Sequence, residues 1–117
     1  MVNPEFSEKH CKPCEGGVAP LSSSQAQEYL KTLQGWQISS DAKSIFKEYL
    51  MKNFMSAIEL IVRISEVAES EDHHPDLHLT GYRKLRIELS THAISGLSEN
   101  DFILAAKIEQ LPKELKK

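Results

Sequence analysis

The sequence predicts an α+β fold, a two-layer sandwich in which a four-stranded antiparallel sheet carries three helices on one face. Apolar residues recur at helical spacing in three segments, at the start, middle and end of the chain. Between these segments lie two pairs of short stretches with the composition or alternation of β-strands. The order α-β-β-α-β-β-α favours hairpins covered by helices, and 117 residues suit a single domain.

The first helix is expected to follow a leader, residues 1–20, that has no hydrophobic periodicity and contains several prolines and glycines. Ser22 and Gln25 form a capping-box pattern that begins the helix, and Gly35 ends it. Two short strands are then predicted around a polar turn, over residues 36–39 and 45–50. We therefore expect a flexible leader over 1–20 and one domain over 21–117.

The middle helix is predicted over residues 53–69, where the helical pattern is strongest. The apolar face of this segment is wide, which suggests a helix that lies across a sheet. The residues assigned to that face are Phe54, Ala57, Ile58, Ile61, Val62, Ser65 and Ala68.

The second hairpin and the last helix complete the domain. Two strands are predicted over residues 77–80 and 84–90, joined by a tight turn, and the second of them alternates apolar with charged residues. Ser98 then begins a helix with Asp101 at the capping-box position, and Pro112 closes it.

The overall composition excludes several classes of function. The net charge is −3 and the isoelectric point is near 5.9, whereas surfaces for nucleic acid or anionic membranes need a concentrated basic patch. No run approaches the roughly 18 apolar residues of a membrane-spanning helix, and the first residues lack the apolar core of a signal peptide. We expect a cytoplasmic protein with no nucleic-acid or membrane partner.

The two cysteines, Cys11 and Cys14, form a C-x-x-C pattern within the leader. With His10 they offer three ligands, but a structural zinc site usually takes four. A thioredoxin-type redox pair would open a helix after a strand, and no strand is predicted here. A reduced, flexible tail is therefore favoured, while metal binding and redox use stay open.

Histidines are concentrated in one part of the chain. Imidazole has a reference pKa of about 6.5, so a cluster of imidazoles is suited to moving protons near neutral pH. The carboxylates Glu69, Glu71 and Asp72 lie just before the cluster and could fix the tautomers of its rings. Four of the five histidines fall within 20 residues, namely His73, His74, His78 and His92.

The predicted hairpin brings three of these histidines to one place. His73 and His74 precede its first strand and His92 follows its second strand, so all three belong to the same end of the strand pair. His78 alternates with Leu77 and Leu79 and is expected to point into solvent. Spacing alone leaves three interpretations open: histidines that only cap a helix end, an acid–base site, and a metal site that uses all four.

A family resemblance narrows these interpretations. The segments that carry it are EDHHPDL over 71–77, Tyr82, LSTH over 89–92 and GLSENDFILAAKIEQL over 96–111, together with GW over 35–36 and IFKEYLMKNFMSAI over 45–58. With them the chain resembles the pterin-4a-carbinolamine dehydratase family over about residues 21–111. It departs from animal members at Leu77, where they have an aromatic residue, and in a loop that is one residue longer.

The resemblance implies a hydro-lyase that removes water from 4a-hydroxytetrahydropterin and gives quinonoid dihydropterin, without metal or other cofactor. This reaction recycles the pterin cofactor of aromatic amino-acid hydroxylases. By the same resemblance His73, His74 and His92 are catalytic, with His73 or His92 protonating the hydroxyl group and His74 mainly holding the substrate. The residues implied to bind substrate or orient the histidines are Glu69, Asp72, Pro75, Thr91, Ala93 and Asp101.

The resemblance also implies a partner for the chain. Helices on one face leave part of the sheet uncovered, so a homodimer or homotetramer is also expected from the fold. Animal members in addition serve as dimerisation cofactors for a homeodomain transcription factor, through the helical surface that makes their tetramer. This leaves a binding module as the rival to an enzyme.

Overall fold

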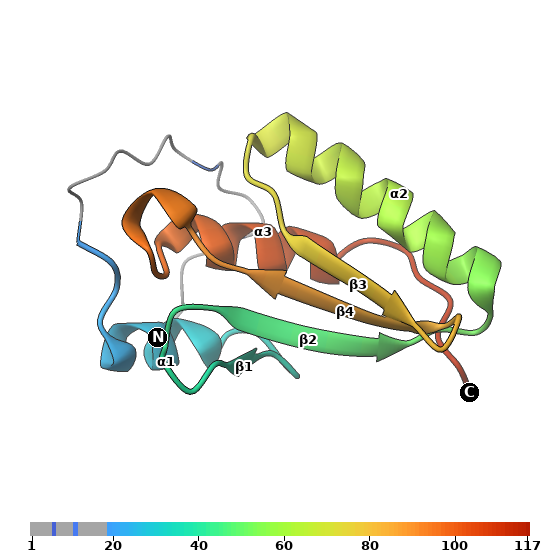
Figure 1. Ribbon diagram of the computed structural model, residues 1–117, viewed down its shortest axis with the longest axis horizontal. Helices are drawn as coiled ribbons and strands as arrows, with labels where there is room; N and C mark the ends of the chain where they lie inside the picture. The colour runs from blue at the N-terminus through green and yellow to red at the C-terminus, as the bar shows by residue number, and fades with distance from the viewer. Residues whose placement is uncertain (1–5, 7–10, 12–18) are drawn as a thin grey trace.

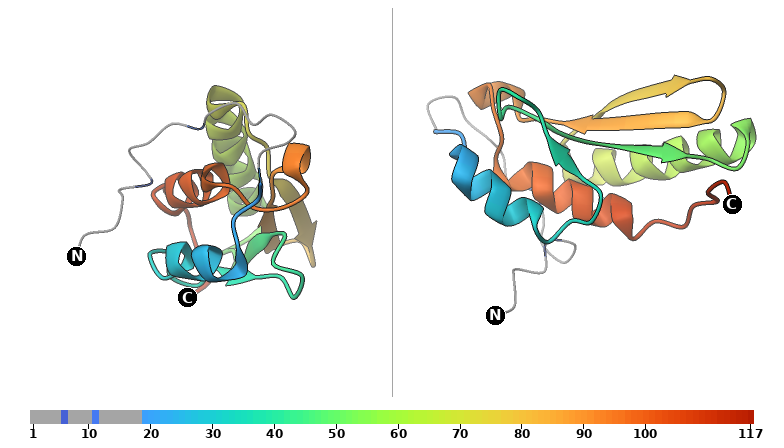
Figure 2. Two further views of the ribbon diagram at one scale, coloured as in Figure 1. Left: turned by 90° about the vertical axis from the view of Figure 1, so that its left-hand side faces the viewer. Right: turned by 90° about the horizontal axis from the view of Figure 1, so that it is seen from below.

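The computed structural model describes Phe6, Cys11 and residues 19–117, and it confirms the α+β sandwich (Figure 1). Four strands form one sheet in the order β1-β2-β4-β3, with every neighbouring pair antiparallel. Figure 2 shows the three α-helices together on one face of that sheet. The elements are α1 (Ser23–Leu30), β1 (Gln37–Ile38), β2 (Ile45–Leu50), α2 (Phe54–Glu71), β3 (Asp76–Thr80), β4 (Lys84–Leu89), a short 3₁₀ turn η2 (His92–Ile94) and α3 (Glu99–Glu109).

Local capping signals set the beginnings of α1 and α3 as the sequence indicated. Ser22 and Gln25 form the capping box of α1, and Ser98 and Asp101 form that of α3. β2 has the predicted bounds, but β1 is only two residues long. β1 ends early because Ser39 begins the turn, with its Oγ accepting hydrogen bonds from the N–H groups of residues 43 and 44.

The predicted core face of α2 is wrong in part. Phe54 and Val62 are 49% and 51% exposed, whereas the buried residues of α2 are Ser56, Ala57, Leu60, Ile64 and Ala68. Apolar residues occupy so many positions of α2 that periodicity cannot choose between adjacent stripes. The helix therefore buries one apolar stripe and leaves a second one, around Phe54 and Val62, at the surface.

The leader contributes to the core. Phe6 is only 3% exposed, and its ring centroid lies 5.2 Å from that of Tyr29 and 6.1 Å from that of Phe102. Cys11 packs against the same cluster. The prediction that residues 1–20 lie outside the core is therefore wrong at these two positions, while Cys14 and its C-x-x-C geometry lie outside the described residues.

The end of α3 is tied to the sheet by one carboxylate. Glu109 Oε2 accepts hydrogen bonds from Trp36 Nε1, Lys47 Nζ and the Tyr49 hydroxyl group. Burial alone would raise the pKa of Glu109, but the hydrogen bonds from Tyr49, Lys47 and Trp36 outweigh it and lower that pKa. Burial and the adjacent carboxylate raise the pKa of Tyr49. This network closes the two-layer core at the β1 edge.

Replacing Glu109 with glutamine is expected to lower the free energy of unfolding at pH 7 by roughly 1–3 kcal/mol, because three donors lose their charged acceptor. A lowered native pKa contributes stability that is present above the unfolded value, about 4.3, and is lost as pH falls through the native value. The difference from wild type should therefore shrink below about pH 4. Urea denaturation at pH 7 and at acidic pH measures it, with Glu59→Gln on the exposed side of α2 as the matched control. A difference that is independent of pH would contradict the assignment.

Within the part of the chain that the structure describes, no helix combines the length and apolar character that a membrane span requires.

Candidate active site

The end of α2 places the first two histidines. Asp72 adopts a left-handed conformation, with φ of 53°, directly after the last helical residue. The backbone N–H of His73 then bonds to the carbonyl of Ala68 at 3.2 Å, so the chain turns back over the helix end. His73 points inward as a result and His74 lies outside, since their side chains are 12% and 54% exposed.

His73 is held by a buried carboxylate. His73 Nε2 lies 2.7 Å from Oδ1 of Asp101, a residue with no exposed surface. An ionised carboxylate only accepts hydrogen bonds, so this contact puts a ring hydrogen of His73 on Nε2 and leaves Nδ1 outside the contact. A carboxylate that fixes the tautomer of an imidazole is the arrangement used in acid–base sites.

The second oxygen of Asp101 fixes the carboxylate itself. Oδ2 accepts from the Thr91 hydroxyl group at 2.8 Å and from the Ser98 N–H at 3.0 Å. The Thr91 and Ser98 hydroxyl groups are also 2.8 Å apart. Asp101 thus joins the end of α2, the segment after β4 and the first turn of α3, and its capping-box role does not exclude a role in the site.

His74 has a carboxylate partner of its own. Its Nε2 lies 2.5 Å from Oε2 of Glu69, which belongs to the last turn of α2. Both side chains are more than half exposed, so the pair contributes little to stability. His74 follows His73 in the chain and lies at the surface, so it can contact a bound molecule.

Strand register supports the convergence predicted for His92. Asp76 pairs with Glu88, so continuing the antiparallel register beyond the ladder sets residue 73 opposite residue 91. Figure 1 shows the start of β3 and the η2 turn at the same end of the hairpin. Thr91 reaches His73 through Asp101, and His92 opens η2 as an exposed residue. Among residues 19–117 no hydrogen bond joins His92 to the other two histidines.

The remaining residues assigned to the site lie around this cluster. Pro75 is partly buried between His74 and β3, while Asp72 and Ala93 are exposed. Thr91 and Gly96 pair through their backbones, which closes the loop that carries His92 and Ala93. Ser98 was expected only as a helix cap, and its hydroxyl contact with Thr91 could not be inferred from spacing.

The prediction for His78 is that it points into solvent, and it does so. It is exposed in β3 opposite Arg86, while Leu77 and Leu79 face the core. A metal site built from all four histidines is therefore inconsistent with the fold. Among the described residues no group of three or more histidine, cysteine, aspartate or glutamate side chains is placed to hold a metal ion.

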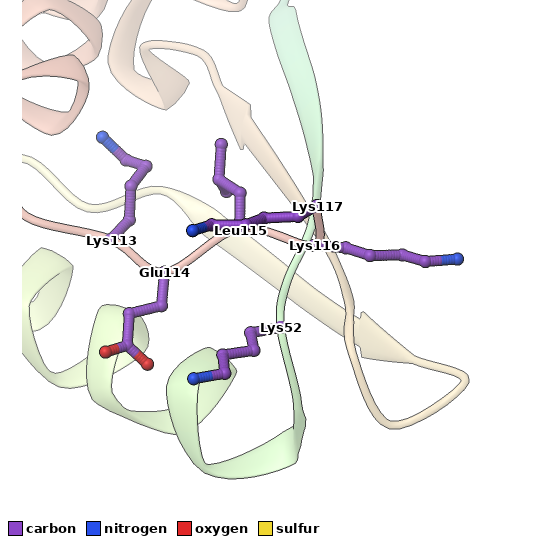
Figure 3. Close-up of a pocket in the computed structure, with 6 residues that line it drawn as sticks. All are labelled: Lys52, Lys113, Glu114, Leu115, Lys116 and Lys117. Carbon is purple, nitrogen blue, oxygen red and sulfur yellow. The ribbon is translucent and has the colours of Figure 1, made fainter.

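A separate groove of about 500 Å³ lies at the opposite end of α2 from the histidines (Figure 3). Figure 3 shows the Lys116 side chain extending to one side, and those of Lys52 and Glu114 to the other. The lining side chains do not converge, so we do not place the chemistry there. They are Lys52, Lys113, Glu114, Leu115, Lys116 and Lys117.

Comparison with known proteins shows which chains this one is similar to. Residues 19–111 match a family described as pterin 4 alpha carbinolamine dehydratase. Halorhodospira halophila has a protein named after this dehydratase that is 46% identical over 106 residues, 91% of this chain and 96% of that protein. Arabidopsis thaliana has a pterin-4-alpha-carbinolamine dehydratase 2, mitochondrial, that is 41% identical over 113 residues, 94% of this chain and 60% of that protein. The crystal structure of a transcriptional coactivator/pterin dehydratase from Brucella melitensis has a TM-score of 0.72 and 30% identity, over 77% of this chain and 95% of that one.

Proposed function

Because the chain belongs to the pterin 4 alpha carbinolamine dehydratase family, we propose that it is a hydro-lyase that converts 4a-hydroxytetrahydropterin to quinonoid dihydropterin and water. The observation that carries the proposal is the contact between His73 and the buried, fully hydrogen-bonded carboxylate of Asp101. It supplies an imidazole with a defined tautomer at the edge of the fold, beside His74 and near His92.

The reaction needs two proton transfers. The C4a hydroxyl group leaves as water once it has gained a proton, and the ring nitrogen N5 loses its proton as the C4a–N5 double bond forms. Positioned side chains that carry out such transfers contribute roughly 10²- to 10⁴-fold each. We assign protonation of the hydroxyl group to His73 or His92. Imidazoles can supply both steps, so the proposed mechanism uses no metal or other cofactor.

The other site residues have supporting roles in this proposal. His74, which contacts Glu69 and is more than half exposed, is assigned the role of holding the substrate. Thr91 orients Asp101 and so acts on His73 indirectly. Asp72, Pro75 and Ala93 are proposed to line the pterin site.

We also propose that the chain forms a homodimer or homotetramer. The surface stripe of α2 supports this, since Phe54, Met55 and Val62 are 49%, 62% and 51% exposed along one helix, and exposed apolar patches of this kind mark interaction sites. A binding-module role would use the same stripe. If substitutions in this stripe abolished function while the His92→Ala variant stayed fully functional, the binding module would be favoured over the enzyme.

A direct dehydration assay tests the proposed function. Purified protein is added to freshly generated 4a-hydroxytetrahydropterin, and the change in absorbance is followed against the spontaneous reaction. Acceleration in proportion to protein concentration is expected. A rate equal to the spontaneous one would overturn the proposal, including its link to pterin recycling for an aromatic amino-acid hydroxylase.

A further inference from the structure

The leader is joined to the site through the residue that ends α2. Glu71 Oε1 accepts a hydrogen bond from the backbone N–H of Cys11 at 2.7 Å. The Cys11 thiol in turn lies 3.6 Å from the carbonyl oxygen of Asn100, in the first turn of α3. Cys11 therefore bridges the end of α2 and the start of α3, the two helix ends that flank the histidine site.

The same carboxylate has a second attachment to α3. Glu71 Oε2 lies 3.6 Å from Lys107 Nζ, and the Glu71 and Lys107 side chains are only 6% and 16% exposed. A charge with so little access to water is costly unless it is paired and hydrogen-bonded. Among the contacts of Glu71 that meet this requirement are a backbone donor, the Cys11 N–H, and an ammonium group from α3, Lys107 Nζ. We name Cys11, Glu71 and Lys107 the clamp.

The clamp sits next to both partners of the central hydrogen bond in the site. Glu71 is two residues before His73, and Asn100 is one residue before Asp101. Between Glu71 and His73 the chain passes only through the left-handed Asp72. Movement of the end of α2 relative to α3 would therefore change the distance between His73 Nε2 and Asp101 Oδ1 directly.

We propose that Glu71 is a positioning residue for the dehydration, and that through Cys11 and Lys107 it holds α2 against α3 and so fixes His73 against Asp101. Cys11 then belongs to the scaffold of the site, although its sequence position suggested a flexible leader. The effect on kcat rests on the proposed function. The effect on the His73–Asp101 contact, followed by nuclear magnetic resonance, rests on the structure alone.

The test compares Glu71→Ala with Glu71→Gln and with Glu66→Ala, which removes an exposed carboxylate from the same helix. Misplacing a reacting group by about 1 Å costs about 10²-fold, so a partial shift in Glu71→Ala is expected to lower kcat by roughly tenfold and to leave KM unchanged. Glu71→Gln keeps an acceptor for the Cys11 N–H and should lose less. Glu66→Ala should match wild type.

A second readout is independent of activity. The His73 Nε2 hydrogen, which Asp101 shields, is followed by nuclear magnetic resonance, and its exchange with water should be faster in Glu71→Ala than in wild type. Unchanged kcat and unchanged exchange in a folded Glu71→Ala would overturn the proposal. If Glu71→Ala does not fold, Lys107→Met is tested in its place, because it removes the ammonium group from the clamp. Unchanged kcat and unchanged exchange in folded Lys107→Met would then overturn the proposal. If wild type has no dehydratase activity, the proposed function fails, and the exchange rate still decides the positioning role.

Discussion

Replacing His73 with alanine is expected to lower kcat for the dehydration by about 10²- to 10⁴-fold, because the variant lacks the imidazole whose tautomer Asp101 fixes. Of the two histidines paired with carboxylates, His73 is the less exposed one, and its carboxylate partner is the buried one. Its Nε2 is occupied by Asp101, so we expect Nδ1 to exchange protons with the substrate. The measurement is kcat for wild type and variant in the absorbance assay.

The loss of activity must be separated from a loss of structure. His73→Ala leaves Asp101 Oδ1 without its partner, and an unsatisfied buried acceptor costs about 1–3 kcal/mol. His73→Gln offers an amide donor in place of the ring but cannot take up a proton, so it should fold better than alanine and be equally inactive. Activity close to wild type in a folded His73→Gln variant would show that proton transfer does not depend on His73.

The chain provides a matched control for this prediction. His78 lies only five residues further along, within β3, and is exposed on the outer face of that strand. His78→Ala is therefore expected to keep the kcat of wild type. A comparable loss in both variants would mean that the assay reports general damage to the hairpin rather than removal of a reacting group.

Much of the fold could be predicted because its signals are local. A capping box depends on residues three apart, and the Ser22–Gln25 and Ser98–Asp101 boxes set the starts of α1 and α3 as expected. Two-residue alternation identified β4, whose Leu85 and Ile87 are completely buried. These patterns are decided by neighbours in sequence, which are visible without a structure.

The errors arise where distant contacts decide. Leu60 and Ile64 are completely buried, whereas Phe54 and Val62 are about half exposed. The residues packed against α2 decide this, and the periodicity of α2 alone does not. Phe6 is a lone aromatic residue in a polar segment, and only its packing against Tyr29 and Phe102 makes it part of the core. A solitary apolar residue gives no period to detect.

The candidate site shows the same division. Period-two strands and a short turn suffice to bring residues 73 and 91 to one end of the hairpin, so the histidine cluster could be inferred from topology. The bond from His73 to Asp101 crosses 28 residues and depends on how α3 packs. The sequence indicated that Asp101 caps a helix, and the family resemblance indicated that it belongs to the site. Neither predicted the hydrogen bonds by which one carboxylate does both.

The bonds to Asp101 lead to the second large effect, expected for Asp101→Asn. The carboxylate accepts on both oxygens, from His73 on Oδ1 and from Thr91 and the Ser98 N–H on Oδ2. Asparagine has one acceptor oxygen and one donor NH₂ group. The position of Oδ2 faces two donors, so the amide oxygen should stay there and the NH₂ group should face His73 Nε2.

Two donors cannot bond to each other, so His73 must move its hydrogen from Nε2 to Nδ1 or lose the contact. Either outcome changes the protonation or the position of Nδ1, the His73 nitrogen that we propose exchanges protons with the substrate. A reversed tautomer costs about 10⁴-fold in kcat in serine proteases whose triad aspartate is replaced by asparagine. Because His92 can share the proton transfers here, we expect a smaller loss, about 10²- to 10³-fold in kcat.

Nitrogen-15 nuclear magnetic resonance of the His73 ring distinguishes this cause from simple disorder. The Nε2–H form should dominate in wild type and the Nδ1–H form in Asp101→Asn, at a temperature where both are folded. Asp76→Asn serves as the control, because Asp76 is an exposed carboxylate at the start of β3, only three residues from His73. A reversed tautomer with undiminished kcat would remove His73 from the reaction and leave His92 as the acid. A large loss of kcat without a change of tautomer would instead assign Asp101 the task of holding α3, Thr91 and His73 in place.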